Sequence, residues 1–388
     1  MRRLGFATAA LLLLHVTLDL NIGVTASEAA VKPAESRRLT QWHLQYLHMT
    51  ECHRHSQGEG VVVAVPDTGV EPHPDLRRNL LLGTDILAGG TGNGQRDRNS
   101  HGTGMAGLIA AHGQPNGTGA FGISPKAKIL PIFSSPPSSD GDPDELAQGI
   151  EFAISRGVDI ISISSSGATS RRLSQAIGTA LASDIVIVAG AGNRPVEHIV
   201  GYPAREPGVL AVGGIDQKGK RAAVSVTGPE LDIVAPAVDI YSTSINGKYR
   251  KGTGTSDATA IVAGAAALVR SKYPYLPAAE VVHRLTATAV DKGPPGRDDE
   301  YGYGVIDLVA ALTEDVPPLG FESTSASAPA GSGSTTTAVA EPGDDGGQSW
   351  ATIRGLATLG VIVAAGGAWA LIARRRRRGD DPPPRISR

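Results

Sequence analysis

Three residues of this chain are of the types that can together catalyse hydrolysis through a nucleophilic side chain. Asp67 follows an aliphatic run and precedes Thr-Gly, whereas His101 and Ser256 each lie where a glycine-containing loop leads into a helix-like stretch. A serine hydroxyl attacks a carbonyl only when a base removes its proton. Histidine is such a base near neutral pH, and an aspartate can orient its imidazole. The set predicts an acyl-enzyme mechanism with Ser256 as nucleophile, His101 as base and Asp67 as the orienting acid.

A fourth polar residue, Asn193, follows Ala-Gly-Ala-Gly at the end of another aliphatic run. We expect its amide to donate to an oxyanion beside the backbone N–H of Ser256, because a helix start favours negative charge. Each of the four residues also has an ordinary interpretation as a turn, loop or helix-capping residue. Their occurrence together, in the order Asp, His, Ser, favours catalysis over those alternatives.

Aliphatic runs alternate with helix-like stretches through the middle of the chain, and this pattern predicts the elements that position the four residues. The predicted strands are Val61–Val65, Ile129–Phe133, Val158–Ile163, Ile185–Ala189, Val209–Gly213 and Leu231–Ala235. The predicted helices are Gly104–Ala111, Asp144–Ser155, Arg171–Ala182 and Ala258–Lys272. Strands that are apolar on both faces and separated by helices indicate an α/β fold with a mainly parallel sheet covered on both sides. In such sheets, function lies at the carboxyl ends of the strands.

The segments that carry these residues resemble the motifs of the subtilases, the subtilisin-like serine proteases. The resemblance covers about residues 55–312 and lies in the segments 65–76, 101–107, 122–127, 189–193 and 254–264. The chain order Asp, His, Ser is also that of subtilisin, which is a general example of this triad order. The resemblance implies a subtilisin-like three-layer fold and a serine endopeptidase that needs no cofactor. It further implies that Asp67, His101 and Ser256 form the triad and that Asn193 completes the oxyanion hole.

The same resemblance implies where a substrate binds and where this chain departs from its family. An extended peptide is expected to pair with the strand edge formed by Ser164, Ser165, Ser166 and Gly167. Ser162, Ser165 and Ser166 stand where the family has Asn, Leu and Gly, so the side-chain preference of the adjoining pocket is not carried over. Pro66 stands where the family has an aliphatic residue, and it removes a backbone N–H donor from a central strand. We therefore expect the strand to be distorted where it positions Asp67.

Both ends of the chain differ in composition from this core. Residues 1–26 combine a basic start, an apolar run and small residues, which is typical of a secretory signal peptide. The alternative is an uncleaved N-terminal anchor. Residues 353–373 contain an uncharged apolar stretch long enough for one transmembrane helix, and five arginines follow it directly. The arginines predict that the tail, residues 374–388, is cytoplasmic. The alternative is a buried helix rich in alanine and glycine.

These ends frame the predicted domains. An N-terminal extension (27–54) precedes the catalytic domain (55–316), and a linker rich in Ser, Thr, Gly and Pro (317–352) leads to the membrane span. The chain is therefore expected in the cell membrane as a single-pass protein, with the catalytic domain on the extracytoplasmic side. Whether the extension is an inhibitory propeptide or an ordered wrap around the body stays open.

Composition limits the partners and cofactors. The 388 residues carry a net charge of −2, which gives no sign of a nucleic-acid partner, and one cysteine, which excludes an intramolecular disulfide. A group near the N-terminus, consisting of His43, His48, Cys52, His53 and His55, lacks the spacing of a structural zinc site. The acidic run 140–145 is better explained as a loop that enters a helix than as a calcium site. No metal is predicted.

The order of signal peptide, subtilase domain, linker, span and basic tail further resembles that of the mycosins, the actinobacterial subtilases associated with type VII secretion. Segment 41–47 also resembles the stretch that precedes the mycosin domain, although the disulfides expected of mycosins are absent. The resemblance implies a protease that processes proteins linked to type VII secretion. One alternative is a scaffold that stabilises a secretion complex, with cleavage secondary or lost. Another is a degradative surface protease unconnected with secretion.

Overall fold

The computed structural model describes residues 40–320, except 88, 90, 116–117 and 137–140. The predicted signal peptide, the membrane span, the basic tail and nearly all of the linker lie outside the described residues. Within the described ranges, no helix combines the length and the apolar character that crossing a membrane requires.

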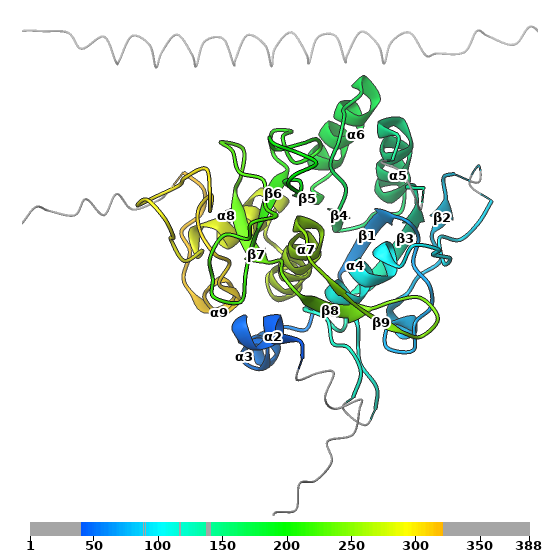
Figure 1. The fold of residues 1–388 in the computed structure, drawn as a ribbon, viewed down its shortest axis with the longest axis horizontal. Coiled ribbons are helices and arrows are strands. Elements are labelled where there is room, and N and C mark those ends of the chain that lie inside the picture. Colours follow the sequence, from blue (N-terminus) through cyan, green and yellow to red (C-terminus); the bar gives the residue numbers. More distant parts are fainter. Residues whose placement is uncertain (1–39, 88, 90, 116–117, 137–140, 321–388) are drawn as a thin grey trace, which may run out of the picture. The chain divides into compact units, whose positions relative to one another are not determined.

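A parallel sheet of seven strands forms the centre of the described body, in the order β2-β3-β1-β4-β5-β6-β7 (Figure 1). The strands are β1 (Val62–Asp67), β2 (Thr84–Asp85), β3 (Lys128–Phe133), β4 (Ile160–Ile163), β5 (Val186–Gly190), β6 (Leu210–Ile215) and β7 (Ile233–Pro236). The strand order reverses direction at β1, which lies between β3 and β4. Ligands of open α/β sheets bind at such a switch point, so a cleft is expected at the carboxyl ends of β1 and β4.

Helices cover both faces of the sheet and give the predicted α/β arrangement with a mainly parallel sheet. On one face, α5 (Pro143–Ser155) and α6 (Arg171–Ala182) pack against each other and enclose one apolar core. On the other face, α4 (His101–Ala110) and α7 (Thr255–Lys272) enclose a second core. Figure 1 shows α7 in the middle of the body, with α4 beside it. Since α7 is buried along most of its length, its alanines and glycines permit close packing on several strands.

Several elements were not among those that the sequence predicted. An antiparallel hairpin, β8 (Ile240–Thr243) and β9 (Tyr249–Gly252), packs beside α4. Two further helices, α8 (Ala278–Ala287) and α9 (Leu308–Thr313), pack against α7, and a short 3-10 turn covers Arg77–Asn79. The hairpin escaped prediction because β9 reads Tyr-Arg-Lys-Gly, without the apolar alternation that identifies a half-buried strand.

The described part of the N-terminal extension is an ordered wrap on the body. It consists of α2 (Trp42–Tyr46) and α3 (Met49–His55), drawn in blue in Figure 1. The Gln41 amide donates to the carbonyl of Phe121 at 2.9 Å, and the Trp42 indole donates to the carbonyl of Val238 at 3.0 Å. None of the described extension residues lines the cleft that contains the predicted triad.

Pro66 does not distort β1, contrary to our expectation. The register with β3 continues through Pro66 and Asp67, which lie opposite Ile132 and Phe133. The pairing of β1 with β4 involves only Val63 and Ala64 of β1, so it ends before the proline. The missing N–H therefore falls where the paired register with β4 has already ended.

Candidate active site

Asp67 and His101 are joined directly at the carboxyl end of β1 and the start of α4. The Nδ1 atom of His101 lies 2.8 Å from Oδ1 and 2.9 Å from Oδ2 of Asp67. The Asp67 carboxylate is buried, with 5% of its side chain exposed, and it also accepts a 2.7 Å hydrogen bond from the Thr68 N–H. This geometry leaves Nε2 of the imidazole to act on the nucleophile, as a serine triad requires.

The two groups shift each other's protonation in opposite directions. Burial alone raises the pKa of Asp67, but the charge of His101 and the hydrogen bonds outweigh it and hold that pKa below its usual value. Burial lowers the pKa of His101, whereas the charge and the hydrogen bond of Asp67 raise it above its usual value overall. Asp67 thus stays ionised at neutral pH, and its carboxylate stabilises the imidazolium that forms when His101 takes a proton.

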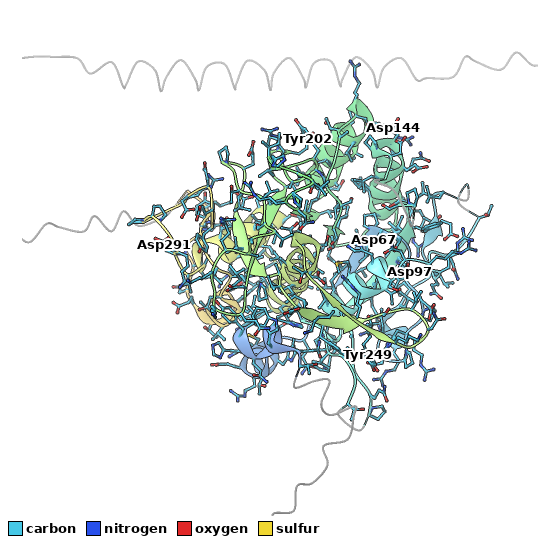
Figure 2. All side chains as sticks on the ribbon, in the orientation of Figure 1. Asp67, Asp97, Asp144, Tyr202, Tyr249 and Asp291 are labelled. Atoms are coloured by element: carbon cyan, nitrogen blue, oxygen red, sulfur yellow. The ribbon has the colours of Figure 1, made fainter. Side chains whose placement is uncertain are left out.

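A second aspartate, Asp97, holds the loop before His101 in place, and the sequence analysis missed it. Its Oδ1 accepts from the Thr68 hydroxyl at 3.0 Å, and its Oδ2 accepts from the N–H and hydroxyl of Thr103 at 3.0 and 2.7 Å. It thereby ties the residue after Asp67 to the first turn of α4. Figure 2 shows Asp97 and Asp67 on the side of the body where α4 lies. Its position four residues before His101 was the only available signal.

Ser256 lies in the first turn of α7, where backbone N–H groups have no partner within the helix. Its hydroxyl donates to the carbonyl of Ser164 at 2.8 Å, and the Ser164 hydroxyl donates to the carbonyl of Ser256 at 3.2 Å. Because a hydroxyl has a single proton, Ser256 does not donate to His101 in this rotamer. Attack on a substrate therefore requires rotation of the Ser256 side chain toward the imidazole.

Asn193 follows β5, and its amide orientation is fixed from the α7 side. Its Oδ1 accepts a 2.9 Å hydrogen bond from the Thr255 N–H, so Nδ2 is the atom left to donate. The Thr255 hydroxyl lies 3.3 Å from the carbonyl of Gly192 and links the same two segments. Asn193 and the N-terminus of α7 therefore present donors from neighbouring elements, which is the arrangement of an oxyanion hole.

A cleft of about 370 Å³ brings all the predicted site residues together. Its walls include the triad, Asn193 and the predicted substrate edge Ser164, Ser165, Ser166 and Gly167. The N–H and the carbonyl of Gly167 both pair with Tyr202, at 2.9 and 3.2 Å. Gly167 is thus already paired with another segment of the cleft lining, which leaves the preceding serines as the edge that a substrate strand can use. Beyond the triad, Asp142 and Glu197 are the charged residues among the described part of the cleft lining.

The histidine and cysteine residues near the N-terminus do not converge. Cys52 is buried, and its thiol lies 3.4 Å from the carbonyl of Leu47, with a pKa raised to about 12 by burial. His53 bonds to the carbonyl of Ile123 at 2.8 Å, whereas His43 is buried within the core. In the acidic run, Asp142 caps the start of α5 by accepting from the Asp144 N–H. Among the described residues, no three His, Cys, Asp or Glu side chains are grouped to hold a metal ion.

Comparison with known proteins finds related sequences and related structures. Residues 58–304 match the subtilase family, peptidase S8. Subtilisin DY of Bacillus licheniformis is 40% identical over 260 residues, which cover 66% of this chain and 92% of that protein. The structure of MycP1 from Mycobacterium smegmatis matches with a TM-score of 0.63 and 31% identity, over 71% of this chain and 85% of that one. MycP3 of the type VII (ESX-3) secretion system matches with a TM-score of 0.61 and 33% identity, over 71% and 88%.

Proposed function

Because this chain belongs to the subtilase family of serine peptidases, we propose that it is a membrane-anchored endopeptidase that processes proteins linked to type VII secretion. The observation that carries the peptidase chemistry is the cleft in which the Asp67–His101 pair meets Ser256 and Asn193. The catalytic domain acts on the extracytoplasmic side, and residues 353–373 anchor it to the membrane.

The geometry supports a two-step hydrolysis through an acyl-enzyme. Ser256 Oγ leaves the Ser164 carbonyl, gives its proton to Nε2 of His101 and attacks the scissile carbonyl. Asn193 Nδ2 and the Ser256 N–H donate to the oxygen that becomes negative. His101 returns the proton to the leaving amine, and the peptide bond breaks. Water then attacks the ester by the same route, which frees Ser256 and the second product.

The secretion context rests on two kinds of support. The described body is similar over most of its length to MycP1 and to MycP3, and the latter is described as part of a type VII secretion system. The apolar stretch with five following arginines suits a single span with a cytoplasmic tail. A protease held by a linker of this kind acts on protein substrates that pass close to the membrane.

Labelling with a fluorophosphonate probe tests the catalytic part of the proposal. This reagent modifies an activated serine, so we expect the full chain to be labelled at Ser256 and the label to be lost in Asp67→Ala and His101→Ala. As a matched control, Ser165→Ala removes a cleft hydroxyl and should keep the label. A folded protein that stays unlabelled at Ser256 contradicts the proposal.

A scaffold role is the second candidate, and the rotamer of Ser256 favours it, because the hydroxyl donates to Ser164 instead of His101. Ser256→Ala distinguishes the two roles in the host cell. A protease loses processing of its substrates when Ser256 is replaced, whereas a scaffold keeps secretion intact. Deletion of residues 353–388 in the same host tests the anchor, since it should release the protein from the membrane fraction.

A further inference from the structure

The residue directly after the nucleophile, Asp257, is a buried carboxylic acid with 2% of its side chain exposed. Its ionic partner is Arg250 of β9, whose Nη1 lies 3.5 Å from Oδ1 of Asp257. Within the described part of the chain, these same two atoms are buried without a hydrogen-bond partner. A buried ion pair without good hydrogen bonds contributes little net stability, because desolvation offsets the attraction. Stability therefore does not account for this pair.

Two glycines leave the space that the pair occupies. A Cβ on Gly104 would lie 2.5 Å from Nη1 and 2.8 Å from Cδ of Arg250. A Cβ on Gly252 would meet Nη2 of the same arginine and would lie 2.6 Å from both carboxylate oxygens of Asp257. Any larger residue at either position would force the arginine out. The guanidinium therefore lies in a slot between the first turn of α4 and the end of β9.

This slot adjoins the catalytic base. Gly104 comes three residues after His101 on α4, and helix positions three apart lie on the same face with Cβ atoms about 5–6 Å apart. The guanidinium fills the space that a side chain at position 104 would take, so its charge lies beside the imidazole. On the other side, Asp257 adjoins Ser256 in the first turn of α7. The pair thus connects the helix that carries the base with the helix that carries the nucleophile.

We propose that Arg250 and Asp257 are positioning residues for His101, which connect α4 to α7 and hold two opposite charges beside the imidazole so that they cancel there. This inference rests on the proposed peptidase function and deepens it. Three charged groups act on the imidazole: Asp67 from β1 and Asp257 from α7 favour the imidazolium, and Arg250 from β9 disfavours it. While both residues of the pair are present, their effects on His101 oppose each other, and among the three charged groups Asp67 has the largest net influence on its protonation.

Replacing Asp257 with asparagine tests the cancellation. The Asp257→Asn variant keeps the shape of the side chain but leaves the Arg250 charge uncompensated beside His101. We expect the acid limb of the kcat/KM profile to move to lower pH by roughly one unit, because an adjacent cation disfavours the imidazolium. In the double variant Arg250→Met/Asp257→Asn, both charges are gone, and the limb should return to the wild-type position. A purely structural role would reduce kcat/KM at every pH without moving the limb.

The neighbouring Lys251 provides a matched control. It lies next to Arg250 on β9, its side chain is 57% exposed, and it pairs with Asp239 at 3.7 Å. Lys251→Met removes the same charge from the same strand and should leave the limb in place. If Asp257→Asn fails to fold, Arg250→Met replaces it, and we expect a limb at higher pH because Asp257 then acts alone on the imidazole. A limb that stays in place or moves down in that variant overturns the proposal.

A second measurement separates this inference from the peptidase function. The full chain carrying Ser256→Ala is labelled with ¹³C at histidine Cε1, and the His101 signal is titrated by NMR with and without Asp257→Asn. We expect the imidazole to titrate at lower pH in the Asp257 variant. If this shift appears although the wild type hydrolyses no peptide, the proposed function fails and the positioning role stands. If Asp257→Asn moves neither the titration nor the limb further than Lys251→Met does, the pair has no role at the base.

Discussion

Acidic solution should destabilise this protein through His43, an imidazole in the N-terminal wrap. The side chain is fully buried, and both ring nitrogens are buried without a hydrogen-bond partner in the described part of the chain. Burial lowers the pKa of His43 from 6.5 to about 3, because no group compensates the cost of a charge there. The folded state therefore holds the ring neutral where the unfolded chain would take up a proton.

The sign and the size of the effect follow from this difference. The folded pKa lies below the unfolded one, so stability is complete above about pH 6.5 and falls as the pH drops toward 3. Each pH unit in that window costs about 1.4 kcal/mol. Between neutral pH and about pH 5 the loss is ~2 kcal/mol, and it hardly depends on the folded pKa, because the folded protein binds almost no proton at either pH.

Urea unfolding of the wild type and of His43→Leu, at about pH 7.5 and about pH 5, measures this loss. The other titratable groups act equally on both proteins. The unfolding free energy of His43→Leu relative to that of the wild type should therefore rise by about 2 kcal/mol between the higher and the lower pH. His55→Leu changes an exposed histidine in α3 and serves as the control. If the wild type and His43→Leu lose stability in parallel on acidification, the reasoning is refuted.

Three further outcomes follow from the site. Asn193→Ala removes the side-chain donor of the oxyanion hole, so kcat should fall about 10²–10³-fold with KM little changed, as steady-state kinetics on a peptide ester will measure. Asp97→Asn weakens the hydrogen bonds that hold the loop before His101. It should lower the free energy of unfolding by roughly 2 kcal/mol, since charge-assisted hydrogen bonds to buried donors are lost. A variant as stable as the wild type in urea unfolding would show that the loop keeps its conformation without Asp97. None of the described residues that line the cleft is Lys or Arg, whereas Asp142 and Glu197 are acidic. Peptides with lysine near the scissile bond should therefore have a higher kcat/KM than their leucine analogues. Glu197→Gln should reduce this ratio by about fivefold, or ~1 kcal/mol. If the ratio is the same for the wild type and the variant, Glu197 does not determine the preference.

The central strands could be predicted because burial on both faces leaves a continuous aliphatic signal. The stretches around Val63, Ile161 and Val188 were recognised as strands on that signal alone. The β8–β9 hairpin could not be, because its packing depends on tertiary contacts with α4. Ser242, for example, lies in β8 and donates at 2.7 Å to the carbonyl of Gly104, 138 residues earlier in the chain. Such a contact leaves no periodic pattern in the sequence.

At the site, the reacting groups could be predicted and their supporting groups could not. Asp67, His101, Ser256 and Asn193 lie in recognisable local segments, and the structure brings them to one cleft. The roles of supporting residues depend instead on which partners the fold supplies. The distortion that we expected at Pro66 did not occur, because a strand tolerates a missing donor where its pairing on one side has ended.

Two buried aspartates act on the same imidazole, and their environments give them opposite properties. The pKa of Asp67 is lowered, because burial is outweighed by the charge of His101 and by its hydrogen bonds. The pKa of Asp257 is raised, because burial dominates over the charges of Arg250 and His101. Both side chains are buried, with 5% of Asp67 and 2% of Asp257 exposed, so burial does not distinguish them. What distinguishes them is that both oxygens of Asp67 lie within 3 Å of Nδ1 of His101, whereas Oδ1 of Asp257 has no donor among the described residues. The orienting role in the triad therefore follows from the donors around the carboxylate, and the type and burial of the residue do not determine it.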